Sequence, residues 1–129
     1  MPLLSLSIGS NVNAAANVRR AVAALREHFG ELDLSTVYES EAVGFDGDNF
    51  LNLVVTTETA ESLGSISVYL KQLEDRMGRD RSQPRFSGRV IDVDILTYGD
   101  LQGERDGVEL PRGEVTRNAY VLRPLAELL

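Results

Sequence analysis

Apolar residues recur along this chain at two spacings, and the spacing separates expected strands from expected helices. Runs in which apolar and polar positions alternate are typical of half-buried strands. These runs predict strands at residues 3–8, 32–38, 50–57 and 90–98. Gly9-Ser10-Asn11 reads as a break that ends the first of them.

Two further stretches repeat apolar residues every three or four positions, which is the period of a helix. The first begins near Ala14, and Gly30 is placed to end it. The second covers about residues 61–77 and stops at Gly78. The resulting order, β-α-β-β-α-β, predicts an α+β, ferredoxin-like domain over residues 1–129, with two helices on one face of an antiparallel sheet. We expect the tail after Gly99, with a short helix at its end, to cover part of the open face.

Bulk composition bounds the class of protein. The 129 residues are 43% hydrophobic and 26% charged, which is typical of one globular domain. The absence of cysteine excludes disulfides and thiolate metal sites, and one histidine, His28, excludes a multi-histidine zinc site. The N-terminal residues have neither a signal-peptide pattern nor an apolar run of membrane-spanning length, so we expect a cytoplasmic protein without membrane partners.

Charge is distributed unevenly along the chain. The net charge of -7 argues against non-specific binding of nucleic acid. However, six of the 13 Lys and Arg residues fall between Lys71 and Arg89. This concentration of cations predicts a local anion site.

Asp92 and Asp94 flank Val93 in the last expected strand, directly after those cations. The strand period of two points both carboxylates to one face, roughly 7 Å apart at the backbone. At that distance they repel by roughly 2 to 3 kcal/mol at an effective dielectric of 20, and a magnesium ion would offset the repulsion. A solvated face on which both acids pair with nearby arginines is the alternative.

Strand alternation also relates these acids to residues 50–57. If the alternate leucines and valines of that strand pack under the helices, Phe50 and Asn52 point to the open face. Asp92 and Asp94 point to the same face. An aromatic ring, a carboxamide and two carboxylates would then converge there.

Several short motifs in this order carry a resemblance to a known family, and they run almost from end to end. They are Ile8-Gly9-Ser10-Asn11, Val37-Tyr38-Glu39-Ser40 with Val43-Gly44, Phe50-Leu51-Asn52, Leu73-Glu74, Gly78-Arg79, Gly88-Arg89-Val90-Ile91-Asp92-Val93-Asp94-Ile95-Leu96, Leu110-Pro111 and Tyr120-Val121-Leu122-Arg123-Pro124-Leu125. The chain resembles the 6-hydroxymethyl-7,8-dihydropterin pyrophosphokinase family, folate-pathway enzymes that transfer diphosphate from ATP to a pterin alcohol. It looks like a short and somewhat divergent member.

The resemblance implies a role for each matching residue. Asp92 and Asp94 would hold two Mg²⁺ ions that bridge the ATP phosphates, and together with Arg79 and Arg89 they form the expected catalytic set. The implied ATP-binding residues are Glu74, Arg81, Arg85, Ile95 and Arg112. The implied pterin-binding residues are Ser40, Val43, Gly44, Phe50, Asn52 and Tyr120. Phe50 and Tyr120 are also compatible with ordinary core rings, the arginines with a solvated loop, and Glu74 with a plain surface charge.

Three positions depart from the family pattern. Arg112 stands where the family has histidine, Asn118 where it has arginine, and Glu41 where a proline follows Ser40. These changes keep a second hypothesis open, namely a divergent paralogue that binds a pterin or nucleotide with weak or altered transfer. A third reading, an open sheet that stacks nucleic-acid bases, is disfavoured by the net charge and by the two acids. The expected partners are therefore small molecules, and the expected state is a monomer or weak homodimer.

Overall fold

A computed structural model describes residues 1–40, 49–78, 90–105, 108–110 and 128. Its centre is a sheet in which β1 (Leu3–Ser10) pairs antiparallel with β4 (Phe50–Glu58) on one side and β5 (Asp92–Tyr98) on the other. Two short strands, β2 (Asp33–Leu34) and β3 (Tyr38–Ser40), pair with the far side of β4. The order β2-β4-β1-β5 confirms the predicted α+β fold with a ferredoxin-like core.

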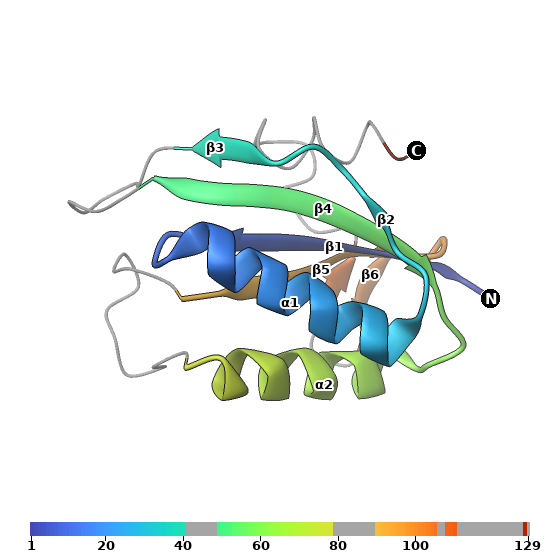
Figure 1. The fold of residues 1–129 in the computed structure, drawn as a ribbon. Helices are drawn as coiled ribbons and strands as arrows, with labels where there is room; N and C mark the ends of the chain where they lie inside the picture. The colour runs from blue at the N-terminus through green and yellow to red at the C-terminus, as the bar shows by residue number, and fades with distance from the viewer. Residues whose placement is uncertain (41–48, 79–89, 106–107, 111–127, 129) are drawn as a thin grey trace.

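Helices α1 (Ala14–Phe29) and α2 (Leu63–Arg76) lie together on one face of this sheet (Figure 1). Helix α1 ends as predicted, because Gly30 takes a positive φ of 92° and donates its N–H to the Arg26 carbonyl. Helix α2 begins after Ser62, whose Oγ accepts a hydrogen bond from the Ser65 N–H at 3.2 Å. In the described part of the chain, neither helix combines the length and the apolar character needed to cross a bilayer.

The main hydrophobic core lies between the helices and the sheet. It takes alternate residues from the central strands and the apolar stripe of each helix. These residues include Leu4, Leu6, Ile8, Leu25, Leu53, Val55, Ile66, Leu70, Leu73, Ile91, Val93 and Ile95. Val54 and Leu96 form a smaller cluster, and Leu128 packs against it. Each of the two is adjacent in its strand to a residue of the main core, so both point to the face of the sheet that the helices do not cover.

The predicted strand over residues 32–38 is interrupted, and Ser35 explains the break. The Ser35 N–H donates to the Val54 carbonyl at 2.9 Å, while the Ser35 Oγ accepts from the Val54 N–H at 2.9 Å. The side chain therefore satisfies a strand donor of β4 that a continuous partner strand would satisfy with its backbone. As a result the segment pairs with β4 as two pieces, β2 and β3.

The prediction that Gly9-Ser10-Asn11 ends the first strand is wrong by two residues. Strand β1 continues through Gly9 and Ser10, because both are paired with β4 and Gly9 is also paired with β5. Pairing on both sides outweighs the weak intrinsic strand preference of glycine.

A hairpin of β6 (Gly103–Arg105) and β7 (Val108–Leu110) follows β5 and was not predicted. Leu110 is 3% exposed and joins the main core. Both strands are three residues long, which is too short for an alternation to be recognised in the sequence. The predicted helix at the end of the tail lies outside the described residues except for Leu128.

An aromatic cluster joins the two helices at the surface. The His28 ring stacks on the Tyr69 ring with centroids 3.6 Å apart, and His28 Nε2 lies 2.9 Å from Glu61 Oε1. The Tyr69 hydroxyl donates to the Ala24 carbonyl at 3.1 Å. Partial burial raises the pKa of the Tyr69 phenol above its ordinary value.

This raised pKa predicts a loss of stability at alkaline pH. Ionising Tyr69 costs more in the folded protein than in the unfolded chain, so its contribution is complete below about pH 10 and is lost as pH rises through the folded-state pKa. We expect the free energy of unfolding of Tyr69→Phe to fall less steeply between about pH 9 and pH 11. Urea unfolding followed by circular dichroism measures both slopes, and equal slopes would contradict the assignment.

Candidate active site

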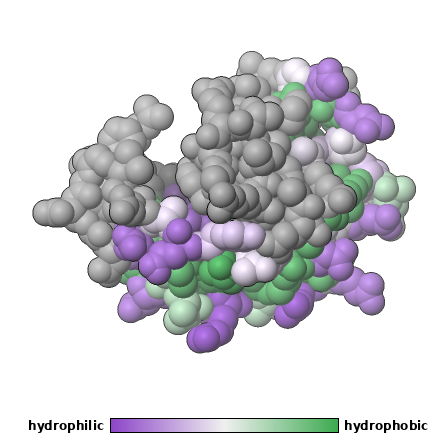
Figure 2. All heavy atoms as spheres, turned by 90° about the horizontal axis from the view of Figure 1, so that it is seen from above, coloured by the Kyte–Doolittle hydropathy of each residue, from purple (hydrophilic) through white to green (hydrophobic). Residues whose placement is uncertain are grey.

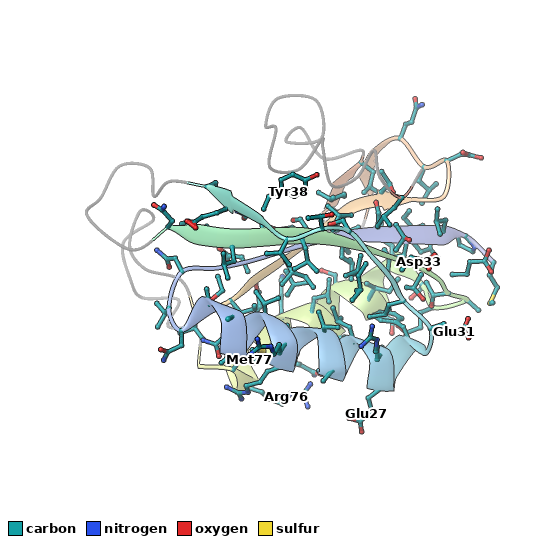
Figure 3. The ribbon with its side chains drawn as sticks, turned by 45° about the horizontal axis from the view of Figure 1, so that its top comes forward. Glu27, Glu31, Asp33, Tyr38, Arg76 and Met77 are labelled. Carbon is teal, nitrogen blue, oxygen red and sulfur yellow. The ribbon has the colours of Figure 1, made fainter. Side chains whose placement is uncertain are left out.

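A row of four residues crosses the open face of the sheet. The register pairs Tyr38 of β3 with Asn52 of β4, Asn52 with Gly9 of β1, and Gly9 with Asp92 of β5. Paired residues of an antiparallel ladder point to the same face, so these positions share the face that the helices do not cover. Figure 3 shows Tyr38 on that side of the sheet, whereas Arg76 and Met77 lie on the helix side.

Asn52 is held in one orientation by its neighbour on β3. Its Nδ2 donates to Ser40 Oγ at 2.8 Å, and its side chain is buried. Strand β3 pairs Ser40 with Phe50, which is half-buried one step along β4 on the same face. Three of the predicted pterin-binding residues, Ser40, Phe50 and Asn52, are therefore brought together.

Gly9 provides the space beside this carboxamide. A Cβ at residue 9 would lie 3.0 Å from Asn52 Oδ1 and 3.9 Å from Phe50 Cδ1. The close approach to Asn52 is the steric reason for glycine here. A residue with a Cβ would require the carboxamide to shift by a few tenths of an ångström.

Asp92 and Asp94 lie at adjacent alternate positions of β5, opposite Gly9 and Ser7. Both are half-buried, whereas Val93 between them is 4% exposed in the core. The prediction that both acids share the open face with Asn52 is confirmed by this register. Because two strand spacings separate them, the backbones of Asn52 and Asp92 are roughly 10 Å apart.

Asp92 and Asp94 resemble a magnesium site with two protein ligands more than a metal site in which side chains supply every ligand. Among the described residues no group of three or more His, Cys, Asp or Glu could hold a metal ion. Magnesium commonly takes only one or two carboxylates and completes its octahedron with phosphate oxygens and water. The donor set of Asp92 and Asp94 therefore matches an ion that arrives with a phosphorylated substrate.

Glu74 lies on the helix side of the same strand. It is 5% exposed, and its Oε2 accepts a hydrogen bond from the Val93 N–H at 3.0 Å. The reading of Glu74 as a plain surface charge is therefore wrong, while its role toward ATP stays a prediction. Ile95, another predicted ATP residue, is 5% exposed with its side chain in the main core. The Ile95 side chain is therefore not on the open face, and the role of Ile95 toward ATP stays a prediction.

Ser10 ties the end of β1 to Val90, two residues before β5 begins. Its Oγ donates to the Val90 carbonyl at 2.5 Å, and the side chain is fully buried. Sequence reasoning did not assign a role to Ser10, Gly9 or Tyr38. Gly9-Ser10 was the available signal, since a glycine in a strand often marks a close approach.

The remaining predicted site residues lie outside the described part of the chain. They are Val43, Gly44, Arg79, Arg81, Arg85, Arg89, Arg112 and Tyr120.

Viewed from above, hydrophilic side chains gather toward the rim of the described surface, and a band of hydrophobic residues lies inside it (Figure 2).

The fold and the row of polar residues from Asn52 to Asp92 define a two-layer α+β protein with a polar small-molecule site on its open sheet face. The model of the 7,8-dihydro-6-hydroxymethylpterin-pyrophosphokinase (HPPK) family matches residues 5–129. The chain belongs to this family, as the motifs predicted. Pyrophosphokinases are enzymes that use ATP as co-substrate.

Named relatives agree with this assignment. The chain is 31% identical over 127 residues to the 2-amino-4-hydroxy-6-hydroxymethyldihydropteridine pyrophosphokinase of Bacillus subtilis, covering 95% of this chain and 75% of the relative. The enzyme of the same name from Aquifex aeolicus is 31% identical over 130 residues, covering 99% and 81%. The folate synthesis bifunctional protein of Chlamydia caviae is 32% identical over 133 residues, covering 97% of this chain and 30% of that longer protein.

The contact between residue 9 and Asn52 gives a testable prediction. We expect Gly9→Ala to lower the free energy of unfolding by about 1 to 3 kcal/mol, because the new methyl group overpacks the Asn52 carboxamide. In an Asn52→Ala background the same change should cost much less. Urea unfolding of the four chains in this double-mutant cycle measures the coupling. An equal loss of unfolding free energy in both backgrounds would mean that the new methyl group does not clash with the Asn52 side chain.

Proposed function

We propose that this chain transfers diphosphate from Mg-ATP to the hydroxymethyl group of 6-hydroxymethyl-7,8-dihydropterin and releases AMP, a step of folate biosynthesis. The observation that carries the proposal is the row on the open sheet face. It places a fixed carboxamide at Asn52 and a carboxylate at Asp92 on the two sides of Gly9. Family membership and the names of the relatives support the same activity.

The pterin is bound at the Asn52 end of this row. With Nδ2 held by Ser40, the carboxamide still offers one N–H and its Oδ1 to the donor and acceptor edge of a heterocycle. Phe50 adds a flat face for stacking beside it. Tyr120, Val43 and Gly44 are proposed to complete the pocket on the strength of the family resemblance.

The phosphates are bound at the Asp92 end. Asp92 and Asp94 hold two Mg²⁺ ions, which when bound neutralise charge on the ATP phosphates. The proposed arginines Arg79, Arg81, Arg85 and Arg89 add fork-shaped donors for phosphate oxygens. Arg112 takes the place of the family histidine in this role. Glu74 is proposed to act on the nucleotide side through its bond to the backbone of β5, and Ile95 through its own backbone.

Alignment of the two substrates is the main task of these residues. The hydroxymethyl oxygen of the pterin forms a bond to the β-phosphorus, and the bond from that phosphorus to the oxygen bridging to the α-phosphate breaks. The electron pair of this broken bond leaves with AMP, and the hydroxyl proton goes to solvent. Holding the hydroxyl near the phosphorus converts an encounter of two molecules into a step within one complex.

No finding favours the alternative of a divergent paralogue with weak or altered transfer. Its motivation, Arg112 and Asn118, lies outside the described residues. A cytoplasmic location, the absence of nucleic-acid partners and a monomeric or weakly dimeric state stay predictions of the sequence.

Removing either carboxylate tests the metal role. We expect Asp92→Asn and Asp94→Asn each to lower the rate of AMP formation by on the order of 100-fold or more, because each loses a charged oxygen ligand. Both substitutions keep the shape of the side chain, so the far-ultraviolet circular dichroism should match the parent. Chromatographic separation of AMP from ATP, with the dihydropterin and Mg²⁺ present, measures the rate.

Asp100→Asn is the matched control. Asp100 is an exposed acid just beyond β5 and outside the row, so its variant should retain the parent rate. Near-parental turnover by either Asp92→Asn or Asp94→Asn would remove the proposed metal role. Loss of activity in all three variants would point to net charge instead of metal binding.

A further inference from the structure

Strand β5 lies at the edge of the sheet within the part of the chain that the structure describes. Its inner side is paired with β1, and no strand of the described residues is hydrogen-bonded to its outer side. Outward-facing N–H groups of an edge strand need other acceptors when they are buried. Val93 has this requirement, since it is 4% exposed.

Glu74 meets the requirement from α2. Its Oε2 accepts the Val93 N–H at 3.0 Å, and Glu74 is itself 5% exposed. A hydrogen bond to a carboxylate is roughly twice as strong as one between neutral groups. The bond from Val93 to Glu74 therefore links α2 firmly to the backbone of β5 at this point.

Val93 lies directly between the two acids, so this link bears on both of them. Because Val93 directs its N–H away from β1, the alternation of an antiparallel ladder turns the backbone N–H and C=O groups of Asp92 and Asp94 toward β1. The peptide segment between the two acids is thus held from both sides. Its inner groups bond to β1, and its outer N–H bonds to Glu74.

Glu74 is separated from the acids by the strand itself. Its bond is on the helix side, whereas Asp92 and Asp94 point to the open face, and the described residues contain no group of three acids able to share a metal ion. Through this bond Glu74 acts on the backbone that carries the two ligands. Residues that hold metal ligands in place commonly change metal affinity when they are replaced.

We propose that Glu74 is a positioning residue that fixes the spacing and direction of the Asp92 and Asp94 carboxylates for a metal-bound nucleotide. The effect of this role on turnover rests on the proposed function. The effect of Glu74 on metal affinity is measured separately.

The test compares three variants of the full chain. Glu74→Leu removes the acceptor with nearly the same volume, and Glu74→Gln keeps an acceptor oxygen without the charge. Leu70→Ala is the matched control, since Leu70 is a buried core residue one helical turn before Glu74 and its truncation weakens α2 packing while leaving the acceptor in place. The probe is Mn²⁺ with α,β-methylene ATP, and its binding is followed by electron paramagnetic resonance. Amide hydrogen exchange at Val93 is followed by nuclear magnetic resonance.

We expect Glu74→Leu to weaken Mn²⁺ binding roughly 10-fold or more and to speed exchange at Val93. Glu74→Gln should stay within about threefold of the parent, because the acceptor is retained. Leu70→Ala should lower thermal stability yet keep the parental Mn²⁺ affinity. The same loss of affinity in Leu70→Ala and Glu74→Leu would overturn the proposal, and so would parental affinity in Glu74→Leu.

Two further measurements keep the outcomes distinct. Rapid exchange of the Val93 amide in the parent chain would overturn the proposal without any variant, whatever the folding of Glu74→Leu. AMP formation by the parent reports on the proposed function alone. A parent that forms AMP, combined with unchanged metal affinity in Glu74→Leu, overturns only the positioning role. A parent that forms no AMP overturns the proposed reaction, while a Glu74-dependent Mn²⁺ affinity still supports the positioning role.

Discussion

The pairing of β1 with a partner strand on each side is the constraint on which the rest of this structure depends. One register fixes Gly9 opposite Asn52, and the other fixes it opposite Asp92. A slip of one residue in either pairing would turn one of these side chains into the helix-facing core and bring an apolar residue out. The core therefore selects the register, and the register assembles the site. In this sense the core on the helix side determines which polar side chains share the open face.

Elements with many alternating or helically spaced residues were predictable from the sequence, and so was their order. Strand β4 and helix α1 have their predicted positions, because each presents an unbroken apolar pattern to one core. The same alternation placed Asn52, Asp92 and Asp94 on one face. Ser35 and Gly9 show where such reasoning fails. In both cases the decisive interaction is with a strand distant in sequence, and local preference favoured a different result.

Site residues differ in the same way. The Asp92 and Asp94 pair is visible in sequence because two acids in an apolar strand are unusual, and a family resemblance then adds their role. The Leu73-Glu74 motif and the spacing of Glu74 from Leu70 and Met77 separate it from the exposed Asp75, but neither signal shows which group Glu74 bonds to. Its burial and its bond to Val93 arise from the packing of α2 against β5. Tertiary packing thus changes its chemistry from that of a solvated charge to that of a fixed acceptor.

The bond from Ser10 to the Val90 carbonyl has a consequence for how this family can vary. On one side of residues 79–89, α2 finishes at a buried Met77, whose N–H bonds to the Leu73 carbonyl. On the other side, Val90 is tied to the fully buried Ser10. Two anchors in the framework therefore set the ends of this segment. The entropy of closing a chain between fixed ends rises only slowly with its length, so insertions and deletions there carry a small thermodynamic penalty. A change in the number of residues that join these two anchors therefore costs the two-layer fold little free energy.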